Sequence, residues 1–470
     1  MSTQPTIRNF GRNVHFRPGR FHAPESEVEL LDILRDNRKG TVRAVGSKHS
    51  WSAAIETRGA LVDMRHFAEI NISGRANQKY VTVGAGCRIR DLLDALNAND
   101  LTLPSVGLIA EQTVAGATAT GTHGSGKHSL SHYVSAVRLA CYNSSGEVPQ
   151  IVDITEGPEL RAARCSLGCL GIVVAVSFPC IPQYFIEEKM TAADTLDEML
   201  ALEDVSPLQQ FYLVPHSWTY YSQERRVASQ NKRSPVAPLY RIYWVTMIDV
   251  GLHVAIKLCA SVIRSRGLTR VLFRHILPKC LIYRPVVDRS DRQLVMNHHF
   301  FRHLEIEIFV RRSNLESSLS FVIDVLSSAD DPQHKLSTTT VDQLRVSGLY
   351  DSAASISGCF THHYPICIRR IVPDDTLISM TSGGDQDWYA ISFITYNEPR
   401  DDFFQLATFL AATMTRLFHA RIHWGKWFPL KAGDVEVEYP DIELFRDVCR
   451  QFDPNRVFAN DFVKEKVGLD

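Results

Sequence analysis

Apolar residues in the first 180 positions recur with two spacings. Residues 26–38 and 90–98 carry them at helical spacing, and Ser26 is placed to cap the first of these helices. Short runs rich in β-branched residues predict five strands at 41–45, 60–64, 80–83, 136–142 and 172–178. The segment 104–132 follows neither pattern. The mixture of helices and strands predicts an α+β fold.

The pattern changes after about residue 183. Apolar runs predict strands at 241–247, 304–310 and 389–395, and helical spacing predicts helices at 315–326, 404–417 and 442–452. A chain of 470 residues is longer than one hydrophobic core usually supports. We therefore place a domain boundary near Pro182, with a first domain over 1–181 and a second over 182–439. Residues 440–470 are expected to pack back on the first domain.

The charge and cysteine patterns exclude several classes of protein. The chain has 51 Lys plus Arg against 52 Asp plus Glu, so it offers nucleic acid no strongly basic surface. Its first 20 residues are polar, which is unlike a secretory signal, and its longest apolar stretches are too short or interrupted to predict a transmembrane segment. Ten cysteines without a CxxC pair predict no metal site. These features favour a cytoplasmic protein.

The first candidate site is a turn of glycine and small hydroxyl residues that follows the strand 41–45. Its members are Val45, Gly46, Ser47, Lys48, His49 and Ser50. Successive backbone N–H groups in such a turn can form an anion nest suited to a diphosphate. His49 would then lie beside the group that the phosphates carry. The alternative interpretation is an ordinary β-turn with a surface histidine.

Two further segments carry candidate chemistry. Residues 104–126 are mostly Gly, Ala, Ser and Thr, so their backbone can approach a flat ligand closely; the alternative is a tight core loop. Residues 421–427 place His423 and Lys426 next to two tryptophans, on either side of Gly425. Lys426 could stabilise a developing anion, and His423 could act as a base or as a hydrogen-bond donor. The alternative for this segment is an aromatic surface strand whose lysine extends into solvent.

Five motifs together resemble the vanillyl-alcohol-oxidase-type flavoproteins, and most closely their aldonolactone oxidase and alditol oxidase branch. The motifs are GSxHS at 46–50, GxxATGTHGSG at 116–126, SLGCLGIV at 166–173, HWGK at 423–426 and DPNRVF at 453–458. The resemblance implies a two-domain FAD-binding fold of the PCMH type, with a mixed α/β cap domain over the substrate. It also implies FAD attached through His49 to the flavin 8α-methyl group. The implied FAD-binding residues are Val45, Gly46, Ser47, Lys48, His49, Ser50, Gly107, Thr113, Gly116, Thr120, Gly121, Thr122, His123, Gly171 and Ile172.

The resemblance also assigns the reacting face. Lys426, His423 and Arg369 would be catalytic, and Thr395, Cys367 and Leu108 would contact the substrate. Two of these positions depart from the family pattern, because Cys367 replaces a carboxylate and Leu108 replaces a serine of the alditol oxidases. A site that lacks two such groups favours a lactone or a less polar hydroxyl compound over a polyol. Glu305 or Glu307 on a neighbouring strand could supply a replacement carboxylate.

The implied function is FAD-dependent oxidation of a small hydroxyl-bearing molecule, a sugar lactone or a related alcohol. A hydride would pass to flavin N5, Lys426 would offset the developing negative charge, and Arg369 would orient the substrate oxygen. Gly107 would leave O2 a path to the flavin, so O2 is the expected acceptor and H2O2 the product. The alternatives are a dehydrogenase of the same fold with another acceptor, an enzyme for a less polar alcohol, and a non-catalytic flavin-binding module.

Overall fold

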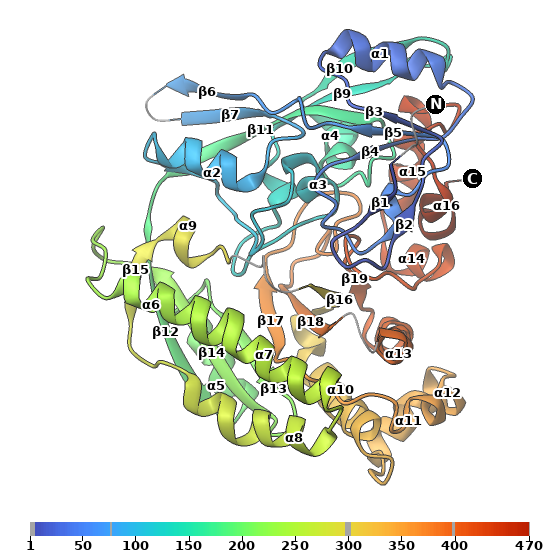
Figure 1. Cartoon of the computed structure of the whole chain (residues 1–470). Helices are drawn as coiled ribbons and strands as arrows, with labels where there is room; N and C mark the ends of the chain where they lie inside the picture. The colour runs from blue at the N-terminus through green and yellow to red at the C-terminus, as the bar shows by residue number, and fades with distance from the viewer. Residues whose placement is uncertain (1–4, 76–77, 297–301, 397–399, 470) are drawn as a thin grey trace.

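The computed structural model describes residues 5–75, 78–296, 302–396 and 400–469 (Figure 1). The first 182 residues form two sheets with helices against them. A parallel sheet has the order β3 (Arg20–His22), β5 (Ala60–Asp63), β4 (Val42–Val45). An antiparallel sheet has the order β10 (Pro149–Ile154), β9 (Ala136–Tyr142), β11 (Ile172–Pro182), β7 (Gln78–Gly84), β6 (Ile70–Arg75), with β8 (Leu101–Thr102) on β11. Strands β1 (Ile7–Arg8) and β2 (His15–Phe16) form a small hairpin.

The longer helices of this half bury one apolar stripe, and the first begins where the sequence provides a cap. Ser26 accepts a hydrogen bond from the Glu29 N–H at the start of α1 (Glu27–Asp36), which buries Leu30 and Leu34. Helix α2 (Ile89–Asn97) buries four apolar side chains in the same way. The segment 104–132, for which no element was predicted, contains the short helix α3 (Val114–Ala119) and a 3-10 turn, Leu130–Tyr133. Helix α4 (Gly157–Arg164) precedes β11.

The cap is built on an eight-stranded antiparallel sheet. Its order is β15 (Val286–Arg289), β12 (Phe185–Ala193), β14 (Thr219–Val227), β13 (Gln210–Val214), β17 (Ile366–Ile371), β18 (Trp388–Tyr396), β16 (His303–Arg311), β19 (Arg421–Ile422). The helices around it are α5 (Leu196–Ala201), α9 (Ser290–Gln293), α10 (Leu315–Asp330), α11 (Thr338–Val346), α12 (Tyr350–Ile356) and α13 (Arg400–Phe418). Figure 1 shows this sheet below the N-terminal sheets, so the strands that end between the two halves can supply a shared site.

The last helices are α14 (Ala432–Glu438), α15 (Ile442–Phe452) and α16 (Asp461–Val467). They contact the N-terminal half. The Val42 N–H donates to the Val457 carbonyl oxygen at 2.8 Å, and the buried Arg43 guanidinium donates to the carbonyl oxygen of Phe458; both acceptors lie between α15 and α16. The division of the chain into domains at residue 181 stays a prediction.

One predicted element is wrong. Residues 241–247, expected to form a strand, lie in a continuous helix made of α6 (Ala237–Tyr243), α7 (His253–Lys257) and the π-helical stretches Trp244–Leu252 and Leu258–Val262. A short run of aromatic and β-branched residues is compatible with a buried strand and with a helix. Only the spacing of apolar residues over a longer window distinguishes the two. Helix α8 (Arg266–Val271), the π-helical stretch Leu272–Ile276 and the short 3-10 helix Leu277–Cys280 follow. We call residues 237–284 the cap hairpin.

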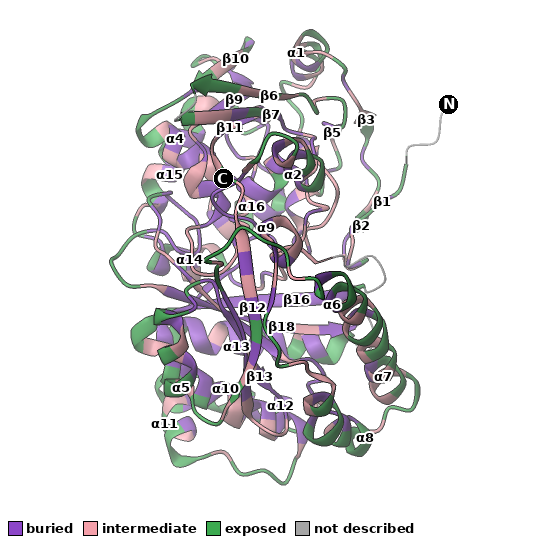
Figure 2. Ribbon diagram, turned by 90° about the vertical axis from the view of Figure 1, so that its left-hand side faces the viewer, coloured by how far each residue is buried: buried purple, intermediate pink, exposed green. Residues whose placement is uncertain are grey.

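The first helix of the cap hairpin bears on the prediction that no segment spans a membrane. Among the described residues, Ala237–Val262 is the one helix that is long and apolar enough to cross a bilayer, by length and composition only. Figure 2 shows the outer side of the cap hairpin largely exposed, in contrast to the buried sheet behind it.

Candidate active site

The turn that follows β4 lines a large cavity. Residues 43–51 form part of the wall of a space of about 1040 Å³, counted to the open mouth, which His423, Gly425 and Lys426 also line. Gly46 allows the turn to pack closely, because a Cβ there would lie 2.1 Å from Thr113 Oγ1. Lys48 adopts a left-handed backbone with φ of 62°, and its carbonyl accepts a 2.8 Å hydrogen bond from the Phe10 N–H. The turn therefore has a fixed shape.

His49 stands in this cavity with an unsatisfied ring nitrogen. Its imidazole stacks on Phe10, with ring centroids 4.9 Å apart. Nδ1 is buried and has no hydrogen-bond partner among the described residues. Burial lowers the pKa of His49 to about 4, so the ring is neutral at physiological pH. A neutral, oriented imidazole with a free Nδ1 is suited to bond a group held in the cavity.

A second cavity of about 700 Å³ adjoins the first. The two share Gln112, His423 and Lys426 as lining residues. Strands β16 and β17 supply Glu305, Glu307 and Arg369 to the second cavity, which is further lined by Leu108, Ile109, Thr122, His123, His253, His303, Tyr364 and Ile394. Charged and imidazole groups therefore meet apolar side chains in one space next to the first cavity.

Lys426 and Glu305 form a buried ion pair at the junction of the two cavities. The Lys426 ammonium donates to Glu305, and only 12% of the lysine side chain and 6% of the glutamate side chain are exposed. Ser392 also donates to Glu305. Burial alone would raise the pKa of Glu305, but the interactions with Lys426 and His303 together outweigh burial and hold the pKa well below the ordinary value. Lys426 Nζ also lies 4.2 Å from the centre of the Trp51 ring, so a cation is fixed at this point.

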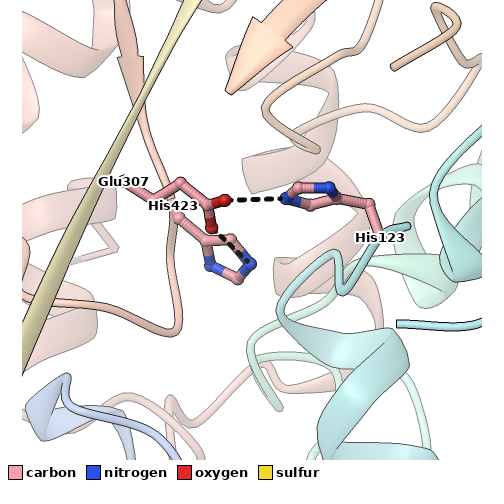
Figure 3. A group of neighbouring side chains, drawn as sticks. All are labelled: His123, Glu307 and His423. Carbon is pink, nitrogen blue, oxygen red and sulfur yellow. Dashed lines mark ion pairs between the residues drawn. The ribbon is translucent and has the colours of Figure 1, made fainter. Parts of the chain in front are cut away.

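Glu307 lies between two histidines (Figure 3). Its Oε1 is 3.4 Å from His123 Nε2, and its Oε2 is 4.0 Å from His423 Nε2. Burial would raise the pKa of Glu307, but its interactions with His123, Lys426 and His423 together outweigh burial and lower the pKa to about 2. Glu307 Oε1 has no hydrogen-bond partner among the described residues, although Arg369 Nη1 is 3.8 Å away. One oxygen of an ionised carboxylate therefore has no hydrogen bond to the described residues, and its neighbours are the His123 imidazole and the Arg369 guanidinium.

Backbone contacts fix the proton positions on the two histidines. His423 Nδ1 accepts a 2.9 Å hydrogen bond from the Gly425 N–H, so the ring proton is on Nε2, facing Glu307. Burial lowers the pKa of His423 to about 3, so this ring is neutral. His123 Nδ1 is 3.0 Å from the Gly124 carbonyl oxygen and must donate to it. Its Nε2 lone pair then faces Glu307, which would stabilise a proton taken up there.

His123, Glu307 and His423 also have the residue types and spacing of a metal site, with ligand atoms within 4.8 Å of one another. The neighbouring charges oppose this use. The Arg369 guanidinium is 3.8 Å from Glu307, and the Lys426 ammonium is held nearby by Glu305. Two fixed cations beside the cluster repel a divalent ion. The cluster is better suited to hold and move a proton.

Most residues predicted for the site line one of the two cavities. The first is lined by Val45, Gly46, Ser47, Lys48, His49, Ser50, Thr113, Gly116, Thr120 and Gly171, the second by Leu108, Thr122, His123 and Arg369, and both by His423 and Lys426. Gly107, Gly121 and Ile172 lie behind these surfaces, outside the lining of either cavity.

Two residues predicted to contact substrate are placed differently. Ile394 faces the second cavity, while the next residue, Thr395, is fully buried and bonds His363 Nε2 at 3.1 Å. Alternate side chains of a strand point to opposite faces, so Thr395 points away from the cavity and the expected contact is corrected. Cys367 is buried behind Arg369 on the same face of β17, and burial raises the pKa of its thiol. A neutral thiol cannot replace the missing carboxylate.

Several lining residues were missed or only suggested by the sequence. Glu305 and Glu307 alternate with apolar residues in β16, so both face the cavity, and this spacing was the available signal. Gln112 was hidden within a run of small residues. His253 comes from the cap hairpin, and its place beside Tyr364, with Nδ1 3.1 Å from the Tyr364 hydroxyl, depends on tertiary packing that no local pattern encodes.

Comparison with known proteins agrees with this architecture. Residues 18–150 match the family model described as FAD binding domain, and residues 176–466 match the one described as D-arabinono-1,4-lactone oxidase. The solved structure of a cholesterol oxidase from B. sterolicum superposes with a TM-score of 0.75 over 98% of this chain and 96% of that one, at 15% identity. The fold and the matched FAD-binding region define an FAD-linked oxidoreductase, and the predicted fold class is confirmed.

The sequence relatives narrow this class. A long-chain alcohol oxidase from an uncultured marine euryarchaeote is 46% identical over 98% of this chain and 97% of its own length. An L-gulono-1,4-lactone dehydrogenase of Mycobacterium tuberculosis is 25% identical, and a mouse L-gulonolactone oxidase is 24% identical, each over at least 96% of both chains. The chain belongs to the D-arabinono-1,4-lactone oxidase family, which confirms the resemblance inferred from the motifs.

Proposed function

We propose that the protein is an FAD-dependent oxidase that converts long-chain alcohols to the corresponding carbonyl compounds and reduces O2 to H2O2. The supporting observation is the composition of the second cavity. Its ionisable groups include Glu307, His123 and Lys426, of which Lys426 also lines the first cavity, and its apolar lining includes Leu108, Ile109 and Ile394. A molecule with one hydroxyl and a long apolar tail matches this combination of polar and apolar lining better than a polyol does.

The first cavity suits FAD. The turn 45–50 offers backbone N–H groups to a diphosphate, and the neighbouring Thr113, Gly116 and Thr120 allow close approach of a flat ring. When bound there, FAD would supply the acceptor for the hydride that leaves the carbinol carbon. Lys426, which lines both cavities, would place a fixed positive charge at the end of the flavin ring nearest the substrate.

The residues of the second cavity would handle the hydroxyl proton. His123 Nε2 carries a lone pair in the tautomer set by the Gly124 carbonyl, so it can accept that proton. Glu307, 3.4 Å away, would stabilise the imidazolium that forms. Arg369 would hold the substrate oxygen, and the His423 Nε2–H would keep Glu307 oriented. His423 therefore serves as a donor rather than as the base.

The FAD is proposed to be covalent, through His49. The unpartnered Nδ1 of a neutral ring inside the cavity supports this bond. Acid-precipitated wild-type protein should keep its yellow colour, whereas His49→Ala should release FAD to the supernatant. The control is His66→Ala, an exposed histidine, which should retain the flavin. Complete extraction of flavin from the wild type would refute covalent attachment and leave FAD binding intact.

The reaction is tested by oxygen consumption with alcohols of increasing length. Wild-type holoenzyme should produce one H2O2 per aldehyde, with kcat/KM rising from butan-1-ol to dodecan-1-ol and little turnover of L-gulono-1,4-lactone. Equal or better turnover of the lactone would refute the substrate assignment. Flavin that is reduced by alcohol but reoxidised only slowly by air would refute the oxidase and leave a dehydrogenase.

The proposed setting is cytoplasmic. All ten cysteines are unpaired, which supports a reducing compartment.

A further inference from the structure

The cap hairpin exposes an apolar surface that the rest of the protein does not cover. Of the twenty large hydrophobic residues exposed among the described residues, thirteen fall between 236 and 283. On the first helix they form one stripe, composed of Leu239, Ile242, Met247, Val250, Val254, Leu258 and Val262. Spacings of three to five residues keep these positions on one face, because the π-helical turns hold more residues than α-helical ones. Figure 2 shows α6, α7 and α8 exposed along one edge of the cap.

The opposite face of the helix is firmly attached to the cap. Tyr240 is buried and donates a 2.7 Å hydrogen bond to Glu188. The Tyr396 hydroxyl donates to the His253 carbonyl oxygen, and Ile256 is fully buried. The helix therefore cannot cross a bilayer without detaching from the sheet and from the cavity that His253 lines. Its amphipathic pattern instead fits a helix that lies in the plane of a surface.

The charges around the stripe identify the kind of surface. Residues 237–284 contain eight Lys or Arg and one acidic residue, Asp249, which is buried, whereas the whole chain is balanced at 51 to 52. Lys257, Arg264 and Lys279 are exposed beside the apolar side chains. Cationic side chains around an apolar stripe complement anionic lipid headgroups over acyl chains. A second copy of the same hairpin would instead bring two cationic surfaces together, which is unfavourable.

We propose that the cap hairpin docks on an anionic lipid membrane and that the substrate enters the second cavity from that membrane. The docking rests on the exposed stripe and its charges alone. The entry route rests on the proposed function, because it requires a lipophilic substrate. The connection is His253: it belongs to the helix that carries the stripe, and with Tyr364 it lines the substrate cavity.

The test is cosedimentation of holoenzyme with vesicles of phosphatidylcholine containing 30% phosphatidylglycerol, compared with pure phosphatidylcholine. Wild type should pellet with the anionic vesicles, and binding should weaken as NaCl is raised. Val250→Ser/Val254→Ser/Leu258→Ser removes three exposed side chains of the stripe and should reduce vesicle binding more than tenfold. Its control, Val28→Ser/Val148→Ser/Val346→Ser, removes three exposed valines elsewhere and should bind like wild type.

Each other outcome overturns the docking. Wild type that remains in the supernatant with anionic vesicles refutes it, as does a stripe variant that binds as well as wild type. If sedimentation without lipid shows a dimer that the stripe variant disperses, and vesicles do not bind, the stripe belongs to a second copy. Turnover of detergent-solubilised dodecan-1-ol is measured in parallel. The stripe variant should keep that turnover and lose turnover of alcohol embedded in vesicles, so failure of the entry route is distinguishable from failure of the proposed function.

Discussion

The cavity junction buries charged side chains, whereas the cap hairpin exposes apolar ones. At the junction, Glu305, Glu307, Lys426 and Arg369 are almost removed from water, and the carboxylates lie within reach of cations or imidazoles. In the cap hairpin, apolar side chains are left in water while its one acidic residue is buried. A buried charge is tolerated where a partner compensates its desolvation, and an exposed apolar stripe is retained where a partner surface covers it. The first region points to chemistry and the second to docking.

The largest expected effect is at Lys426. Lys426→Met removes a fixed cation at the junction, and loss of one such preorganised group typically slows the chemical step by about 10²–10³. Anaerobic stopped-flow reduction of the flavin by dodecan-1-ol should show this slowing. The stripe variant of the cap hairpin should reduce at the wild-type rate with detergent-solubilised alcohol, because its side chains face away from the junction.

The Lys426 variant needs a structural control. Methionine leaves Glu305 as an unpaired buried charge, which can destabilise the fold by about 3–5 kcal/mol. Lys426→Met/Glu305→Gln removes both charges and should recover most of the lost melting temperature. If the double variant also recovers fast flavin reduction, the catalytic role of Lys426 is wrong and its role is structural.

A smaller effect is expected at Gly107. The φ angle of Gly107 is not positive, so the backbone can accept alanine. The added Cβ, however, would lie 2.6 Å from Thr122 Cγ2. Thr122 lines the substrate cavity, so the methyl group should narrow the approach to the flavin. Gly107→Ala should slow reoxidation by air about tenfold, equal to about 1.4 kcal/mol in barrier, and leave anaerobic reduction largely intact.

The matched control for this variant relieves the steric contact. Gly107→Ala/Thr122→Ser lacks the methyl group that the new Cβ meets, so it should reoxidise faster than the single variant. Melting temperatures of both are compared with wild type, since overpacking costs about 1–3 kcal/mol. Reoxidation of a stable Gly107→Ala protein at the wild-type rate would place the O2 path elsewhere.

The smallest effect at neutral pH is expected at His423, whose protonation influences stability only in acid. Burial lowers the pKa of His423 from 6.5 to about 3, so the unfolded chain binds a proton that the folded protein refuses between these values. His423 therefore contributes stability that is present above pH 6.5 and is lost as the pH falls toward 3, by up to about 1.4 kcal/mol per pH unit. His423→Gln should flatten the decline of melting temperature with acidity. An unchanged decline would contradict the low pKa.

His49 and Glu307 limit this flattening. The pKa of His49 is lowered to about 4 by burial, and that of Glu307 to about 2 by its neighbours despite burial. Both therefore also lose stabilising free energy on acidification, His49 below pH 6.5 and Glu307 below pH 4.5. The variant should reduce the pH dependence between 6.5 and 4.5 without abolishing it.

The sequence predicted the FAD half of the protein in detail and the cap only in part. Capped amphipathic helices such as α1, and strands such as β4 and β9, carry signals that operate within about ten residues, so their bounds were close. The turn at 45–50 combined a local pattern with a family motif, and it lines the expected cavity. These features do not depend on contacts that are distant in sequence.

The wrong or missing predictions concern features that depend on contacts between residues distant in sequence. The run at 241–247 carries strand-like residues, and it is helical because its partner surface lies on one side only and it belongs to a helix of 26 residues. Thr395 was expected in the site, but the strand alternation places Ile394 there instead. The grouping of His123 with Glu307 joins residues 184 positions apart, and only the packed sheet brings them to 3.4 Å.

The most direct test of the account is anaerobic reduction of the purified holoenzyme, with flavin absorbance followed after mixing with dodecan-1-ol or L-gulono-1,4-lactone. The account predicts that the alcohol bleaches the flavin completely, with one dodecanal formed per flavin, and that Glu307→Gln, which keeps the size of the side chain, bleaches at least tenfold more slowly. The lactone should bleach wild type far more slowly than the alcohol. Rapid bleaching by the lactone alone, or flavin that dithionite reduces but neither compound does, would contradict it.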